Sequence, residues 1–148
     1  MPSLHDRLRL VLVTDGVGDP RRVEAIVWAA VRGGVRCVQL REPRWSARVL
    51  MQVCERLMPA IDAAGGWLLV NDRVDVAAAR LAHGAQVGHR SLPPDLARAV
   101  LGLGGVLGFS AHDRDELEVA ADARCDFALL SPVWPTTSKP HAPFLGVP

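Results

Sequence analysis

Polar residues suited to chemistry recur along the chain, and each group of them directly follows a short apolar run. Histidine can exchange protons near neutral pH, carboxylates can ligate cations, and arginine and hydroxyl groups can bind anions. The groups are Thr14-Asp15, Gln39 with Arg41 and Glu42, Asn71-Asp72, Gly88-His89-Arg90-Ser91, Ser110 with His112, and the segment from Ser131 onward. Read as strands, the apolar runs place these groups at strand ends, and the sequence predicts a site there.

Helical patterns that end at turn signals separate the apolar runs. We expect strands over residues 8–14, 35–40, 67–70, 84–87, 106–109 and 126–130. We expect helices over 21–31, from Ser46 to the Gly65-Gly66 stop, over 74–81, from Pro93 or Pro94 to 101, and over 113–123. Continuous apolar strands joined by helices predict a parallel sheet covered on its faces.

Two architectures fit this alternation, a doubly wound open sheet and part of a TIM barrel. Both place their sites at the carboxyl edge of the strands, but a site supplied by nearly every strand favours a barrel, in which all strand ends converge on one mouth. The first strand is not followed by the glycine-rich loop of a dinucleotide-binding fold.

A complete barrel typically needs about 200 to 250 residues, so the 148 residues of this chain leave room for six strands. We therefore expect an α/β fold of the TIM (β/α)8-barrel type, here incomplete, with about six parallel strands and five helices. Residues 1–148 are expected to form a single domain that lacks the last barrel units.

The composition excludes several classes of protein. Hydrophobic residues make up 49% and charged residues 22%, as in a folded domain, and 17 basic against 16 acidic residues give a net charge of +1. We therefore expect neither nucleic acid nor a membrane as a partner, since there is no basic field and no apolar run that could span a bilayer. Three cysteines without metal or redox spacing, and an N-terminus unlike a signal peptide, predict a cytoplasmic protein.

Six ordered runs make the chain similar to a known family. They are LVTD (12–15), VQLREP (38–43), LVNDRVDVA (69–77), GAQVGHRSLP (84–93), GFSAH (108–112) and SPVWPTTSKPHAPFLG (131–146). Together they resemble the thiamine phosphate synthase/TenI superfamily of TIM barrels. The resemblance implies an enzyme of thiamine biosynthesis that acts on a small phosphorylated thiazole. One branch is a transferase that couples hydroxymethylpyrimidine diphosphate to thiazole phosphate; the other, TenI, is an isomerase of a thiazole carboxylate phosphate.

Departures from the synthase pattern favour the TenI branch. The synthases usually hold Mg²⁺ with two aspartates; Asp72 matches one of them, but Ser91 stands where the run GQEDLP has the other. Pro43 replaces a usual lysine. Our main expectation is a TenI-like thiazole tautomerase that needs no cofactor. The alternatives are a thiamine phosphate synthase with a degenerate Mg²⁺ site on Asp72, and a non-catalytic binding remnant.

The resemblance also assigns roles to residues. It makes His112 the acid/base and Asp72 a second catalytic candidate. The expected ligands of the substrate or its phosphate are Gln39, Arg41, Asn71, Ser110, Thr136, Ser138 and Lys139. In an incomplete barrel the first and last strands each leave one side unpaired, so we expect the chain either to form a homo-oligomer through these sheet edges or to be only marginally stable.

Overall fold

The computed structural model describes residues 2–16, 18–137 and 143–146, and its centre is a six-stranded parallel sheet. The strands pair in chain order, from the first at one edge to the sixth at the other. They are β1 (Val11–Val13), β2 (Cys37–Leu40), β3 (Trp67–Asn71), β4 (Gly84–Gly88), β5 (Val106–Ala111) and β6 (Phe127–Leu130). The expected parallel sheet, with its six strands in sequence, is confirmed.

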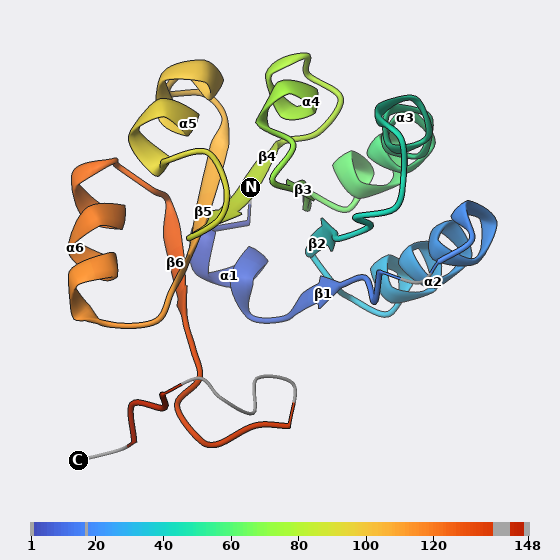
Figure 1. The fold of residues 1–148 in the computed structure, drawn as a ribbon. Coiled ribbons are helices and arrows are strands. Elements are labelled where there is room, and N and C mark those ends of the chain that lie inside the picture. Colours follow the sequence, from blue (N-terminus) through green and yellow to red (C-terminus); the bar gives the residue numbers. More distant parts are fainter. Residues whose placement is uncertain (1, 17, 138–142, 147–148) are drawn as a thin grey trace.

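Six helices in the described part of the chain accompany the sheet. They are α1 (Leu4–Leu8), α2 (Pro20–Arg32), α3 (Ala47–Ala63), α4 (Val74–Ala78), α5 (Pro94–Leu101) and α6 (Arg114–Asp122). Figure 1 shows α2 to α6 in an arc around the outside of the curved sheet, with α1 inside the arc. The arrangement is a half-barrel of the TIM-barrel type, as expected, with one helix more than the five predicted.

The additional helix, α1, shortens the first strand. Residue Leu8 ends α1, and the strand begins only at Val11 rather than at residue 8. Ser3 and Asp6 form a capping box that starts this five-residue helix. The Arg7 guanidinium donates to the Gly65 carbonyl at 2.9 Å and lies 4.7 Å from the centre of the Trp67 ring. Helix α1 therefore packs against the amino end of β3, opposite the edge where the site was predicted.

The longer helices begin at side-chain caps. The Asp19 carboxylate accepts the Arg21 N–H at the start of α2, and the Ser46 hydroxyl accepts the Val49 N–H at the start of α3. Asp113 caps α6 by accepting the Glu116 N–H at 2.8 Å. Because α6 begins directly after β5, this cap fixes the residues between the two elements, including His112.

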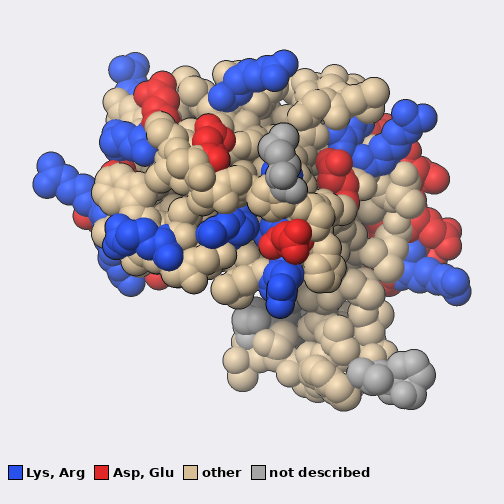
Figure 2. Space-filling view, turned by 180° about the vertical axis from the view of Figure 1, so that it is seen from behind, with Lys and Arg blue, Asp and Glu red and all other residues tan. Residues whose placement is uncertain are grey.

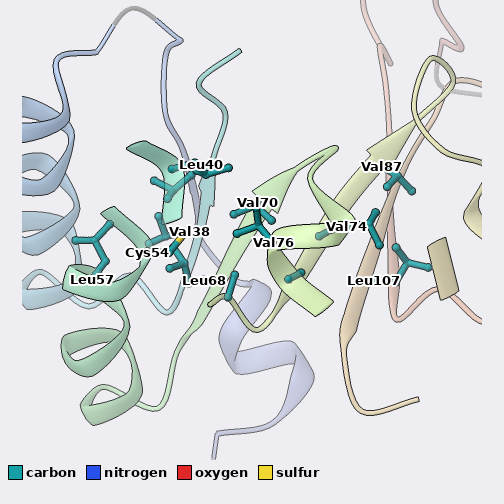
Figure 3. Close-up of a cluster of buried hydrophobic side chains, with 14 of the residues drawn as sticks. Val38, Leu40, Cys54, Leu57, Leu68, Val70, Val74, Val76, Val87 and Leu107 are labelled. Carbon is teal, nitrogen blue, oxygen red and sulfur yellow. The ribbon is translucent and has the colours of Figure 1, made fainter. Parts of the chain in front are cut away.

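The hydrophobic core lies between the sheet and the outer helices. Figure 3 shows Leu57 of α3 packed with strand residues such as Leu40 and Leu68, and all three are fully buried. A fully buried aliphatic side chain stabilises a fold by about 1.5–3 kcal/mol. Because side chains alternate along a strand, the residues between those of the core point to the concave side. Gln39 and Asn71 are among them, so the alternation directs polar groups inward.

The charges on the face opposite that of Figure 1 are mixed. Figure 2 shows basic and acidic side chains interspersed around this face, and neither sign gathers into a continuous patch. This agrees with the net charge of +1. No helix in the described part of the chain is long and apolar enough to cross a membrane.

Candidate functional site

A hydrogen-bonded chain of side chains connects β2 to the loop after β3. The Gln39 amide donates to Asn71 Oδ1 at 2.9 Å, and the Asn71 amide donates to Asp72 Oδ2 at 2.7 Å. Gln39 is buried, whereas Asp72 is exposed just beyond the end of β3. Three of the predicted site residues therefore act as one unit, in which the buried amide orients the exposed carboxylate.

The second oxygen of Asp72 is bound to the turn after β4. The Ser91 hydroxyl donates to Asp72 Oδ1, and Ser91 Oγ also accepts the Gly88 N–H at 2.8 Å. The Ser91 N–H donates to the Gly88 carbonyl at 2.8 Å, which closes a four-residue turn. His89 and Arg90 occupy the two central positions of this turn. Asp72 thus holds the turn through Ser91.

Asp72 adopts a strained backbone conformation to make these contacts. Its φ of 60° lies in the left-handed region, which an aspartate tolerates better than most residues. Its N–H donates to the Gln86 carbonyl at 3.0 Å, so β4 fixes the backbone at this point. The strain supports a functional or positioning role for Asp72.

Gln86 and Ser110 form a second pair, deeper in the half-barrel. The Gln86 amide donates to Ser110 Oγ at 2.9 Å, and the Gln86 side chain is almost fully buried. Its Oε1 has no hydrogen-bond partner among the described residues. A Cβ at Gly108 would collide with this oxygen and with the Phe127 ring, so only glycine fits between them.

His112 is held by a carboxylate on α6. Glu116 Oε2 accepts the His112 backbone N–H at 2.7 Å and lies 3.0 Å from His112 Nδ1. An acceptor at Nδ1 favours the imidazole tautomer that carries its proton there. A proton exchanged with a substrate would then pass through Nε2. The geometry suits a general acid or base whose orientation the carboxylate fixes.

These groups meet at one pocket of about 340 Å³ at the carboxyl edge of the sheet, which we call the mouth pocket. It is lined by Arg41, Asn71, Asp72, Val87, Gly88, His89, Arg90, Ser91, Ser110 and His112. Five of the predicted site residues are in this lining, and Gln39 is linked to it through Asn71. The predicted convergence of strand ends is found for β2 to β5.

The predicted phosphate loop is described only in part. Thr136 lies in the segment after β6, whose ends are joined by hydrogen bonds from Leu145 N–H to the Pro132 carbonyl (3.1 Å) and from Gly146 N–H to the Val133 carbonyl (2.9 Å). Thr136 is not among the described residues that line the mouth pocket. Ser138 and Lys139 lie outside the described residues. Phosphate binding by these three side chains remains a prediction.

The donors present do not fit an Mg²⁺ site of the two-aspartate kind. Of the described residues that line the mouth pocket, Asp72 alone carries a carboxylate; its Oδ2 accepts from the Asn71 amide and its Oδ1 from the Ser91 hydroxyl. Within the described ranges, no group of three or more histidine, cysteine, aspartate or glutamate side chains is placed to hold a metal ion. Mg²⁺ prefers several hard oxygen ligands, and a neutral hydroxyl replaces a carboxylate poorly.

Sequence reasoning did not identify Gln86 and Glu116 as members of the site. Gln86 is the only polar residue of the strand run GAQVG, which was a usable signal because a buried strand rarely holds an amide without a partner. Glu116 lies four residues after His112, a spacing at which helical side chains meet, although here the histidine precedes the helix.

Comparison with known proteins supports the resemblance. Residues 10–148 match the thiamine monophosphate synthase family, TMP-TENI. A putative thiamine-phosphate synthase of Geobacter sulfurreducens is 41% identical over 131 residues, which are 88% of this chain and 62% of that protein. The thiamine-phosphate synthase of Mycobacterium ulcerans is 38% identical over an alignment of 149 residues, which covers 93% of this chain and 68% of that protein.

A solved structure agrees with the sequence relatives. The thiamine phosphate pyrophosphorylase from Pyrococcus furiosus superposes with a TM-score of 0.82 and 26% sequence identity, over 97% of this chain and 68% of the other. The chain spans about two thirds of the length of the relatives that it matches. It belongs to the thiamine monophosphate synthase/TenI family.

Proposed function

We propose that this chain is a TenI-like isomerase, which moves a proton on a thiazole carboxylate phosphate without a metal ion. The observation that carries the proposal is the state of Asp72, whose two oxygens are bound by the Asn71 amide and the Ser91 hydroxyl. A coupling reaction must stabilise a departing pyrophosphate, which calls for dense positive charge. An isomerisation breaks one bond to hydrogen and forms another, so one positioned acid/base group is sufficient.

His112 is the proposed acid/base group. It lines the mouth pocket, and Glu116 orients its ring from the start of α6. The Glu116 carboxylate also stabilises the imidazolium that forms when His112 accepts a proton. Asp72 is the next candidate for the proton transfer, since it lies in the same lining.

The remaining predicted residues are proposed to bind the substrate. Asn71 and Ser110 present an amide and a hydroxyl to the mouth pocket. The buried Gln39 amide orients Asn71 by donating to its Oδ1. Thr136, Ser138 and Lys139 are proposed to bind the phosphate, because hydroxyl and ammonium groups on one loop suit an oxyanion.

A second candidate function is thiamine phosphate synthesis. The relatives that match this chain at 38% and 41% identity are named thiamine-phosphate synthases, one of them a putative one. Asp72 would then be the remaining metal ligand, and Mg²⁺ would assist the departure of pyrophosphate. Ser91 and Pro43 make this function less favourable, because they stand where the synthases usually have an aspartate carboxylate and a lysine ammonium.

Isomerisation can be tested directly. The chain is mixed with a thiazole carboxylate phosphate in excess EDTA, and the two tautomers are followed by proton NMR. We expect enzymatic conversion by the unaltered chain and none above background by His112→Asn. Conversion by His112→Asn at the full rate would contradict the assignment of His112, and no conversion by the unaltered chain would contradict the proposed reaction.

A further inference from the structure

We propose that Gln86 is a positioning residue, which holds the Ser110 hydroxyl as a hydrogen-bond donor to the substrate. The inference rests on the proposed function, because it concerns how the same pocket recognises its substrate. It makes Ser110 specific for a substrate atom that accepts a hydrogen bond, such as an oxygen or a ring nitrogen. Gln86 is not among the described residues that line the mouth pocket, so it acts through Ser110.

Gln86 lies in the middle of β4 and reaches across to β5. Its register partner on β5 is Gly108, and Ser110 lies two residues further toward the carboxyl edge. The Gln86 amide spans this offset and donates to Ser110 Oγ at 2.9 Å. Only 2% of Gln86 is exposed, whereas Ser110 is partly exposed and lines the mouth pocket. The amide therefore supports the hydroxyl from the buried side.

The Gln86 side chain is confined in this position. Both neighbouring strands pair with β4 at Gln86, and its backbone carbonyl accepts the Asp72 N–H at 3.0 Å. A Cβ at Gly108 would collide with Gln86 Oε1 and with the Phe127 ring, so the glycine leaves the space that the amide occupies. A confined amide can hold its partner in one orientation, which a mobile side chain cannot.

The other end of the Gln86 amide is a cost to the fold. Its Oε1 is buried and has no hydrogen-bond partner among the described residues. A buried acceptor without a partner is destabilising, whereas an aliphatic side chain of similar size would fill the same space without that loss. Packing alone therefore does not explain an amide at this position, whereas the hydrogen bond to Ser110 does.

The hydrogen bond determines how Ser110 can bind a substrate. An amide N–H can only donate, so Ser110 Oγ is the acceptor and its own proton remains for another group. No described residue accepts this proton. Ser91, the other hydroxyl among the described lining residues, donates instead to Asp72. Of these two hydroxyls, Ser110 is the one that can donate to a substrate.

Ser110 and His112 are placed to act on the same substrate. Ser110 belongs to β5 and His112 directly follows it; side chains two residues apart share a face of a strand, and both residues line the mouth pocket. In the proposed reaction His112 takes a proton from one substrate atom and returns it to another. Between these steps negative charge develops on the substrate, and a hydroxyl donor fixed beside the base would stabilise it.

A double-mutant cycle of Gln86→Met and Ser110→Ala tests the inference, because methionine is of similar length but cannot donate. Steady-state kinetics give kcat and KM for the thiazole carboxylate phosphate. Isothermal titration calorimetry in excess EDTA gives the affinity for the product tautomer, and urea denaturation gives the stability. Gln86→Leu, a second variant without a donor, repeats each measurement. Leu69→Met is the matched control, since Leu69 is equally buried on β3 but is not among the described residues of the pocket lining.

We expect Ser110→Ala to lower kcat about 10²-fold or more, as the loss of an oxyanion donor does, and Gln86→Met to lower it about tenfold. The two effects should not add, so the double variant should match Ser110→Ala alone. Gln86→Met should be at least as stable as the unaltered chain, since the change removes the unpartnered oxygen. Leu69→Met should leave kcat unchanged.

A merely structural role for Gln86 would give a different pattern. Gln86→Met would then lose stability, and its effect on kcat would add to that of Ser110→Ala, which would overturn the inference.

The two proposals fail separately. If the unaltered chain binds the product tautomer but does not isomerise the substrate, the proposed reaction is overturned, whereas a non-additive loss of affinity in Gln86→Met and Ser110→Ala keeps the role of Gln86. Isomerisation at the full rate by Gln86→Met keeps the reaction and overturns the positioning role.

Discussion

The Ser91 hydroxyl donates a hydrogen bond to Oδ1 of Asp72, and this contact joins the loop after β3 to the turn after β4. The same hydroxyl oxygen accepts the Gly88 N–H at 2.8 Å. A carboxylate used in this way positions protein backbone. The contact thus accounts for two features of the mouth pocket, namely a carboxylate already occupied and an arginine carried on a fixed turn.

Removing the Ser91 hydroxyl should destabilise the turn. In Ser91→Ala the Gly88 N–H and the Asp72 carboxylate each lose a partner, and we expect the free energy of unfolding to fall by about 1 kcal/mol. Ser91→Thr keeps the hydroxyl and serves as the control. Urea denaturation measures both variants. An alanine variant as stable as the unaltered chain would show that the contact does not hold the turn.

His112 and Glu116 should affect the rate rather than the binding of substrate. A general acid/base group typically contributes about 10²- to 10⁴-fold, so His112→Asn should lose most of the isomerisation rate. Glu116→Gln keeps the shape of the side chain but removes the charge that stabilises the imidazolium, so it should reduce kcat less than His112→Asn. Steady-state kinetics of both variants measure kcat and KM separately. A large rise in KM with unchanged kcat would assign both residues to binding instead.

His83 should make the stability of the protein depend on pH. Its Nδ1 accepts the Leu68 N–H at 3.0 Å, and its Nε2 lies 2.9 Å from Asp62 Oδ1. Burial lowers the pKa of His83, assisted by the charge of Arg7 and opposed in part by Asp62. The unfolded chain therefore binds a proton more readily than the folded chain, and stability is lost as the pH falls below about 6.5.

The variant His83→Asn tests this dependence, because an asparagine can still accept a hydrogen bond but does not titrate in this range. Urea denaturation at a series of pH values from about 8 to 5 should show a smaller loss of stability in the variant than in the unaltered chain. Equal losses would assign the pH dependence to other groups.

The edges of the sheet should promote self-association. Val13 of β1 and Leu129 of β6 are 43% and 39% exposed, and the two strands that carry them lie at opposite edges. Val13→Lys should place a charge on an edge and reduce association, as lysine does on natural edge strands. Val119→Lys on the outer helix α6, where Val119 is also exposed, is the control. Light scattering that shows a monomer for the unaltered chain would contradict this prediction.

The sequence predicted those features that depend on the residues of a single strand or helix. Apolar runs and capping residues predicted the strands and the longer helices, and strand ends predicted where Asn71, Asp72 and His112 would meet. Helix α1 was not predicted, because five residues carry too little periodicity and only the Ser3–Asp6 spacing marks them. The partners of site residues could not be predicted either. The contacts between Ser91 and Asp72 and between Gln86 and Ser110 depend on how neighbouring strands are registered.

The central claim is that the mouth pocket supports proton transfer without metal-dependent release of pyrophosphate. Phosphorus-31 NMR tests it in one sample that contains the chain, Mg²⁺, both thiamine precursors and a thiazole carboxylate phosphate. The doubly substituted chain, Pro43→Lys with Ser91→Asp, is run beside it, since these changes supply the missing ammonium and carboxylate. The account predicts conversion of the carboxylate phosphate and no pyrophosphate signal for the unaltered chain, with pyrophosphate appearing only for the doubly substituted one. Enzymatic release of pyrophosphate by the unaltered chain would contradict it.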